Sequence, residues 1–131
     1  MTVQRAWMRM SRGGFTEVIA WQKAYEAVLA VYAATRAFPP EERFALTNQI
    51  RRAAVSIPSN IAEGWGRGST TDYVRFLDQA RGSLYELNTQ LWLACDIGYL
   101  AGADAIFDLL DETSRVLVGL IRSLREPSAR P

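Results

Sequence analysis

Arginine is the residue type whose number and placement in this sequence suggest binding chemistry. Between positions 43 and 81 there are six arginines and only three acids. The arginines are Arg43, Arg51, Arg52, Arg67, Arg75 and Arg81. A guanidinium forms forked hydrogen bonds to phosphates and to carboxylates alike. For phosphates of nucleic acid, the candidate contact residues are Arg51, Arg52, Arg67 and Arg75.

Acidic residues are segregated from these arginines along the chain. The segment 86–112 contains six acids and no basic residue. A basic patch on one subunit could therefore meet an acidic patch on the next, or the charges could pair within one helix, as Asp78 could with Arg75 and Arg81. We favour pairing with protein, because charge patterning alone is weak evidence for a nucleic-acid partner.

Five aromatic residues form a second candidate binding set. They are Trp21, Tyr25, Tyr85, Trp92 and Tyr99, and the last three recur every seven residues. This spacing places them on a helical stripe beside the main apolar stripe, which suggests burial against another subunit. The alternative is base stacking by exposed rings. We favour an oligomer interface, because stacking platforms seldom form a heptad stripe.

The third candidate is a polar group around a proline inside a helix-like run. Asn60 and Glu63, together with Ser56 and Ser59, could line a polar pocket or hold a cation near Pro58. A single carboxylate without a partner is a poor metal site. Polar groups beside a helix break must also be hydrogen-bonded. We therefore interpret the group as structural and expect no metal and no cofactor.

Histidine is absent from the sequence, and this limits the catalytic chemistry. Without histidine the chain cannot form a Ser-His or Cys-His nucleophile pair or the Glu-x-x-His motif of di-iron bundles. The single cysteine, Cys95, excludes an internal disulfide and is expected to pack as a small apolar residue. We therefore expect a protein that is not an enzyme.

Apolar residues recur at helical spacing in four runs, and no segment alternates long enough to indicate a strand. The runs and their boundary signals predict helices at about 17–37, 42–64, 70–97 and 103–125. Ser69 with Asp72 resembles a capping box, and Gly98 marks a helix end. Short connections favour neighbours of opposite direction, so the expected fold is all-α: an antiparallel up-down-up-down four-helix bundle.

Pro58 falls inside the second predicted helix. It cannot donate a backbone hydrogen bond, and its ring collides with the carbonyl of Ala54, at a cost of ~3 kcal/mol in a helix interior. Either one helix continues with a kink, or Ser56 caps a restarted helical turn. We favour the kinked helix, with the small Gly64 allowing another backbone to approach closely.

Length and composition indicate one domain with a substantial core. The chain has 131 residues, is 49% hydrophobic, and carries 15 basic and 14 acidic residues. No apolar run reaches the ~20 residues that span a bilayer. We expect a flexible basic arm over 1–14, a bundle over 15–126 and a tail over 127–131. The arm lacks the apolar centre of a signal peptide, which favours the cytoplasm, and the start could be Met1, Met8 or Met10.

Three stretches resemble a known family: "AWQKAYE", "FPPEERFALTNQIRRAAVSIPSNIAEGWGR" and "RFLDQARGSLYELNTQLWLACDIGYL". They are similar to bacterial four-helix bundle proteins whose founding members are encoded by intervening sequences in large-subunit ribosomal RNA genes. The resemblance runs from about Phe15 to Leu124. It implies an antiparallel bundle, a ring-like homopentamer and no enzymatic activity.

A distant structural relative of that family is the accessory protein of diversity-generating retroelements. That accessory protein is a basic pentamer that binds nucleic acid and a reverse transcriptase. This chain is nearly neutral and lacks the sequence pattern of the accessory proteins. We therefore expect an oligomeric interaction scaffold, with a nucleic-acid-binding accessory protein as the alternative.

Overall fold

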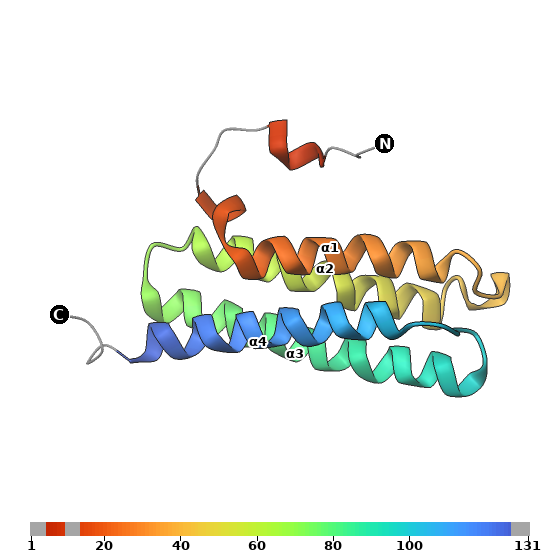
Figure 1. Cartoon of the computed structure of the whole chain (residues 1–131). Coiled ribbons are helices and arrows are strands. Elements are labelled where there is room, and N and C mark those ends of the chain that lie inside the picture. Colours follow the sequence, from red (N-terminus) through yellow and green to blue (C-terminus); the bar gives the residue numbers. More distant parts are fainter. Residues whose placement is uncertain (1–4, 10–13, 127–131) are drawn as a thin grey trace.

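Four long helices and three short 3-10 helices make up the regular structure. The computed structural model describes residues 5–9 and 14–126, and no strand occurs within those ranges. The long helices are α1 (Ile19–Thr35), α2 (Leu46–Trp65), α3 (Thr70–Ile97) and α4 (Asp104–Arg125). The 3-10 helices are η1 (Ala6–Arg9), η2 (Gly14–Glu17) and η3 (Pro40–Glu42). The all-α expectation is confirmed, and Figure 1 shows the long helices side by side.

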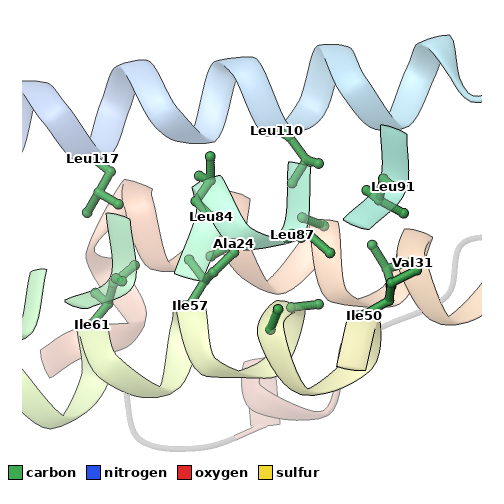
Figure 2. Close-up of a cluster of buried hydrophobic side chains, with 14 of the residues drawn as sticks. Ala24, Val31, Ile50, Ile57, Ile61, Leu84, Leu87, Leu91, Leu110 and Leu117 are labelled. Atoms are coloured by element: carbon green, nitrogen blue, oxygen red, sulfur yellow. The ribbon is translucent and has the colours of Figure 1, made fainter. Parts of the chain in front are cut away.

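Helices that are neighbours in the sequence are also neighbours in space. α2 packs most extensively against α3, while α1 contacts both α2 and α4, and α3 also contacts α4. The pair α1–α2 therefore forms one side of the molecule and the pair α3–α4 forms the other. All four helices contribute to one core, in which Ile57, Leu84 and Leu110 are essentially inaccessible to solvent (Figure 2). Complete burial of each such side chain contributes roughly 1.5–3 kcal/mol.

The predicted boundaries of α3 agree with the structure. The Ser69 hydroxyl accepts a hydrogen bond from the backbone N–H of Asp72 at 3.1 Å, so the predicted cap is confirmed. At the other end, Gly98 adopts the left-handed conformation with φ of 102°. Glycine adopts this conformation without the steric penalty of a side chain, which explains why α3 ends there.

The start of α2 differs from the prediction, because the chain makes the 3-10 helix η3 and a turn before it. The helix begins at Leu46 rather than near position 42. The Glu42 carboxylate accepts a hydrogen bond from the Leu46 backbone N–H at 3.2 Å, and its second oxygen accepts one from the Tyr99 hydroxyl at 2.8 Å. A contact with a residue 57 positions away therefore supports this helix start.

Helix α2 continues through Pro58, which is buried inside it. One helix is therefore present, and a restarted turn capped by Ser56 is not formed. The side-chain amide of Asn60 donates to the carbonyl oxygen of Ser56 at 2.8 Å, one turn earlier. This bond adds a side-chain donor in the turn where proline removes a backbone donor.

The helices α2 and α3 approach each other closely at small residues. The hydroxyl of Ser56 forms a short hydrogen bond with the hydroxyl of Ser83 on α3. Gly64 is buried, and a Cβ placed there would lie 2.6 Å from the Cβ of Phe76. The small residues of α2 therefore do what the sequence suggested, which is to let another backbone come near.

The N-terminal region includes residues that pack on α1 rather than forming a free arm. Trp7 meets Trp21 edge to face, with ring centroids 5.2 Å apart. Arg5 forms a salt bridge with Glu26 at 2.7 Å. These contacts give the basic segment both an apolar anchor and a charge partner on α1.

The other expectations about the two ends of the chain concern residues that lie mostly outside the described ranges. Residues 1–4 and 10–13 of the expected arm, with Met1 and Met10, lie outside the described residues, as does the tail 127–131. Met8 lies within η1. Among the described residues, no helix combines the length and apolar character needed to cross a membrane.

Candidate functional site

A concave surface lined by three arginines lies beside α2 where it packs on α1. It is a groove of about 520 Å³, here called the basic groove. Its lining residues are Tyr32, Arg43, Thr47, Asn48, Arg51, Arg52, Val55 and Ser56. The groove brings together two of the four arginines assigned to nucleic acid and adds Arg43.

Arg51 is fixed in the groove by its own chain. Its Nε donates to Thr35 Oγ1 at 2.9 Å, and its guanidinium lies 4.6 Å from the centre of the Tyr32 ring. The Thr35 hydroxyl in turn donates to the carbonyl of Val31 at 2.9 Å. Arg51 therefore joins α2 to α1, and its charge is held at a set position.

Arg43 and Arg52 differ from Arg51 because both are exposed. Arg43 stacks on Phe44, a ring that is 82% exposed, at 4.6 Å. Within residues 5–9 and 14–126, no carboxylate forms an ion pair with Arg43, Arg51 or Arg52. The groove thus carries three positive charges that no described acid neutralises at contact distance.

Arg67 and Arg75 lie at the other end of α2 and the start of α3. Arg67 forms a salt bridge with Glu63 at 2.8 Å, and Arg75 forms one with Asp72 at 3.4 Å. Both guanidiniums also lie about 5 Å from the Phe76 ring. At 1.5 Å per residue, the 14 residues from position 51 to the end of α2 at position 65 span roughly 21 Å, and Arg67 follows that end. The structure therefore divides the four predicted arginines into two separate pairs.

A second, apolar groove of about 340 Å³ follows the basic groove along α1 and α2, and is here called the apolar groove. Its lining residues are Trp21, Tyr25, Val28, Leu29, Val55, Pro58, Ser59 and Ala62. Val55 lines both grooves and is 40% exposed. The side formed by α1 and α2 therefore offers an arginine-rich concavity that continues into an apolar one.

The aromatic residues predicted to form an interface have different surroundings. Trp21 is only 6% exposed and packs against Trp7 and Phe15 of its own chain. Trp21 therefore belongs to the core cluster, while the neighbouring Tyr25 is half-buried and lines the apolar groove. Sequence periodicity gave both residues the same role because it cannot show that the N-terminal segment covers Trp21.

Tyr99 is held at the loop after α3 and is half-buried there. Its ring centroid lies 5.7 Å from that of Phe38. Its hydrogen bond to Glu42 stabilises the protonated phenol, so the pKa of Tyr99 is raised above its ordinary value. Tyr99 therefore links the loop after α3 to the connection between α1 and α2 within the subunit.

Tyr85 and Trp92 are exposed on α3, at 54% and 59%. They belong to a surface, here called the α3 ridge, whose members all lie on the outward side of that helix. The ridge residues are Tyr85, Glu86, Thr89, Trp92, Leu93, Asp96 and Ile97, and all are exposed. Sequence analysis found the two aromatic members. The apolar residues Leu93 and Ile97 were not predicted as part of this surface. Leu93 lies seven residues after Glu86 and four after Thr89, and Ile97 lies four residues further, so helical spacing would have placed both on the same side of the helix.

The polar residues around Pro58 have structural partners. Asn60 bonds to Ser56, and the Glu63 carboxylate pairs with Arg67 one turn further along. Within the described ranges, no cluster of three or more aspartate, glutamate or cysteine side chains could hold a metal ion. Cys95 is half-buried and packs against the core. These placements offer no cation site around the proline.

Comparison with known proteins gives a family and a fold. The sequence profile described as "23S rRNA-intervening sequence protein" matches residues 16–119. A search of curated proteins found no match. A crystal structure from Bacteroides thetaiotaomicron, described as a protein with unknown function from the S23 ribosomal protein family, is 22% identical. It superposes with a TM-score of 0.73 over 79% of this chain and 96% of that one. With the family profile covering most of its length, the chain belongs to the 23S rRNA-intervening sequence protein family.

Proposed function

We propose that the protein is a non-enzymatic interaction scaffold that acts as a homo-oligomer in the cytoplasm. The observation that carries this proposal is the α3 ridge. Tyr85, Trp92, Leu93 and Ile97 are each at least half exposed, although they are large and apolar. Contiguous apolar residues on a surface usually mark an interaction site. Tyrosine and tryptophan are also over-represented among the residues that dominate binding at interfaces.

The subunit is an antiparallel up-down-up-down bundle with a kink near Pro58, and the assembly is a ring-like pentamer. The short connections between successive helices support the up-down order. The resemblance of the sequence to the intervening-sequence family supports the pentamer. Light scattering coupled to gel filtration tests the assembly, with an expected mass about five times the 14.7 kDa of one chain. A mass of 14.7 kDa at micromolar concentration would contradict it.

The non-enzymatic part of the proposal rests on the residue types. The sequence contains no histidine. The described residues offer no metal-binding cluster, and the arginines at the end of α2 pair with their own acids. A scaffold needs surfaces that bind partners rather than a reactive group, and the α3 ridge and the two grooves are candidates for such surfaces.

A second function has its own supporting observation, which is the unpaired charge of the basic groove. Arg43, Arg51 and Arg52 could contact phosphates of RNA or DNA. The protein would then be an accessory protein that binds nucleic acid, together with a reverse transcriptase or on ribosomal RNA. Binding to a single strand would weaken with salt at a slope of about −0.7 per phosphate neutralised. Fluorescence anisotropy with a labelled oligonucleotide at two salt concentrations measures this slope. A scaffold without nucleic-acid affinity gives no signal at either concentration.

A further inference from the structure

Two surfaces of the subunit are complementary in charge, and both expose apolar residues. The α1–α2 side is concave and basic, and its concavity continues into the apolar groove. The α3 ridge exposes aromatic and acidic residues, and its Tyr85, Thr89 and Trp92 line a pocket of about 520 Å³ beside α4. We propose that the α3 ridge of one copy docks on the α1–α2 grooves of the next copy. This inference rests on the oligomeric function proposed above and names the surfaces that would form its interface.

Charge complementarity is the first argument for this pairing. Arg43 and Arg52 are exposed without a carboxylate partner among the described residues. On the α3 ridge, Asp96 is exposed and forms no ion pair within the described ranges, whereas Glu86 lines a pocket with Arg52 of the same subunit. Opposite charges on two surfaces steer their encounter and fix their register. Asp96, which the sequence separates from the arginines, is thus available to a neighbour.

The apolar residues provide the second argument. Val55 and Leu29 are exposed at 40% and 39% along the grooves, and Trp92 and Leu93 are exposed at 59% and 50% on the ridge. A helix that lays an apolar face into a groove between two other helices is a recurring mode of recognition. Exposed apolar groups are removed from water on both partners, at roughly 25 cal/mol for each Å² buried.

The third argument is the position of the two surfaces on the bundle. α3 contacts α2 and α4, whereas the grooves are built by α1 and α2. The ridge and the grooves are different surfaces, which adjoin where Arg52 and Glu86 line one pocket, so the contact between two copies is heterologous. A heterologous contact leaves one groove and one ridge free at each step, and it closes into a ring when the rotation between subunits permits. This is the type of contact that a cyclic homo-oligomer requires.

The test uses two complementary variants of the full chain. The groove variant carries Arg43→Glu and Val55→Glu, which place negative charge where the acidic ridge would dock. The ridge variant carries Trp92→Arg and Asp96→Arg, which place positive charge opposite the arginines. All four substituted side chains are exposed, and circular dichroism of each variant verifies that the helices remain. Arg122→Glu, at an exposed position on α4 outside both surfaces, is the charge-changed control.

The expected result is that each variant alone is a monomer of about 14.7 kDa, whereas the control keeps the mass of the parent protein. An equimolar mixture should then form a heterodimer of twice the monomer mass. It forms because the ridge variant keeps an intact groove and the groove variant keeps an intact ridge. Its two remaining surfaces, a ridge made basic and a groove made acidic, are opposite in charge, so any growth beyond the heterodimer would also pair a ridge with a groove.

The other outcomes separate the two proposals. If the parent protein is itself a monomer, both the oligomeric function and this interface are wrong. If the parent is an oligomer and both variants keep its mass, the oligomer stands and these surfaces are not its interface. Folded monomeric variants that fail to pair in the mixture would overturn this docking of ridge on groove. A groove variant that keeps its oligomer mass but loses salt-sensitive RNA binding would assign the groove to nucleic acid instead.

Discussion

Gly64 on α2 lies directly against Phe76 on α3. A Cβ added to Gly64 would stand 2.6 Å from the Phe76 Cβ and 3.2 Å from the carbonyl oxygen of Tyr73. Real Cβ atoms do not approach so closely, and these neighbours are a Cβ and a backbone oxygen rather than flexible chain ends. The packing of the two helices at this point therefore depends on the missing side chain.

Gly64→Ala should destabilise the subunit, because the helices must separate to admit the methyl group. Overpacking of this kind costs about 1–3 kcal/mol, partly offset by the ~1 kcal/mol by which alanine is the better helix former. Urea denaturation measures the free energy of unfolding. Gly82→Ala is the matched control, since a Cβ at Gly82 on α3 meets nothing within 4 Å. The control should be neutral or stabilised, and equal effects at both positions would contradict the steric argument.

Arg51→Ala should reduce stability more than Arg52→Ala. Arg51 donates to Thr35 and covers the Tyr32 ring, whereas Arg52 is exposed without a carboxylate partner in the described part of the chain. Loss of a hydrogen bond from a charged group removes about 1.5–3 kcal/mol, and an exposed cation–π contact adds roughly 0.5–1 kcal/mol. Thermal or urea unfolding at low protein concentration compares the two. Equal losses would show that the groove contacts of Arg51 contribute nothing.

The double substitution of Arg51 and Arg52 by alanine addresses the two candidate functions. We expect it to disturb assembly or stability more than RNA binding, because Arg51 already engages protein and we assign Arg52 to a neighbouring subunit. Light scattering gives the oligomer mass, and filter retention at two salt concentrations gives the RNA affinity. Intact oligomers that lose a tight, salt-sensitive RNA interaction would favour the nucleic-acid function.

Pro58→Ala should leave the bundle helical but change its assembly. The proline ring lines the apolar groove, and the residue is expected to bend α2. Alanine would remove an interior penalty of up to ~3 kcal/mol and straighten the helix, so the subunit itself should not lose stability. Circular dichroism and light scattering provide the two readouts. Unchanged oligomer mass together with unchanged thermal stability would show that the bend does not set the assembly.

The contact of the N-terminal segment with α1 should weaken in acid. Hydrogen bonding to Arg5 holds the pKa of Glu26 below its ordinary value of 4.5. A carboxyl group whose folded pKa is lowered contributes stability above its unfolded pKa. That contribution is lost as the pH falls through the folded pKa. The environment of Trp7 on Trp21 reports the change through tryptophan fluorescence below pH 4.5. Glu26→Gln should flatten this acid transition, and a transition of unchanged size would show that another group controls it.

The elements themselves were predictable from the sequence because the signals that create them are local. Ser69 caps α3 and Gly98 ends it through contacts within a few residues. The four apolar runs define the four helices, and their inner stripes match the core around Ile57 and Leu84. The quoted stretches likewise suffice to place the chain in its family.

Contacts between distant segments were decided only by the tertiary structure. The sequence could not show that Trp7 covers Trp21, or that Tyr99 reaches Glu42 and so supports the start of α2. These contacts depend on how each helix is rotated about its axis and on where each loop returns, which local spacing does not fix.

The arginines show most clearly which features follow from the sequence and which depend on the tertiary structure. Residue type and spacing identified a basic segment, and the local difference is that Arg75 follows Asp72 by three residues whereas Arg52 has no acid within four residues. In the folded chain Arg75 lies beside its own Asp72, whereas Arg52 lines a groove whose arginines have no carboxylate partner among the described residues. A salt bridge three residues apart follows from the helix repeat alone. A shared groove exists only after α1 has packed on α2, so the binding surface is a property of the packed helices.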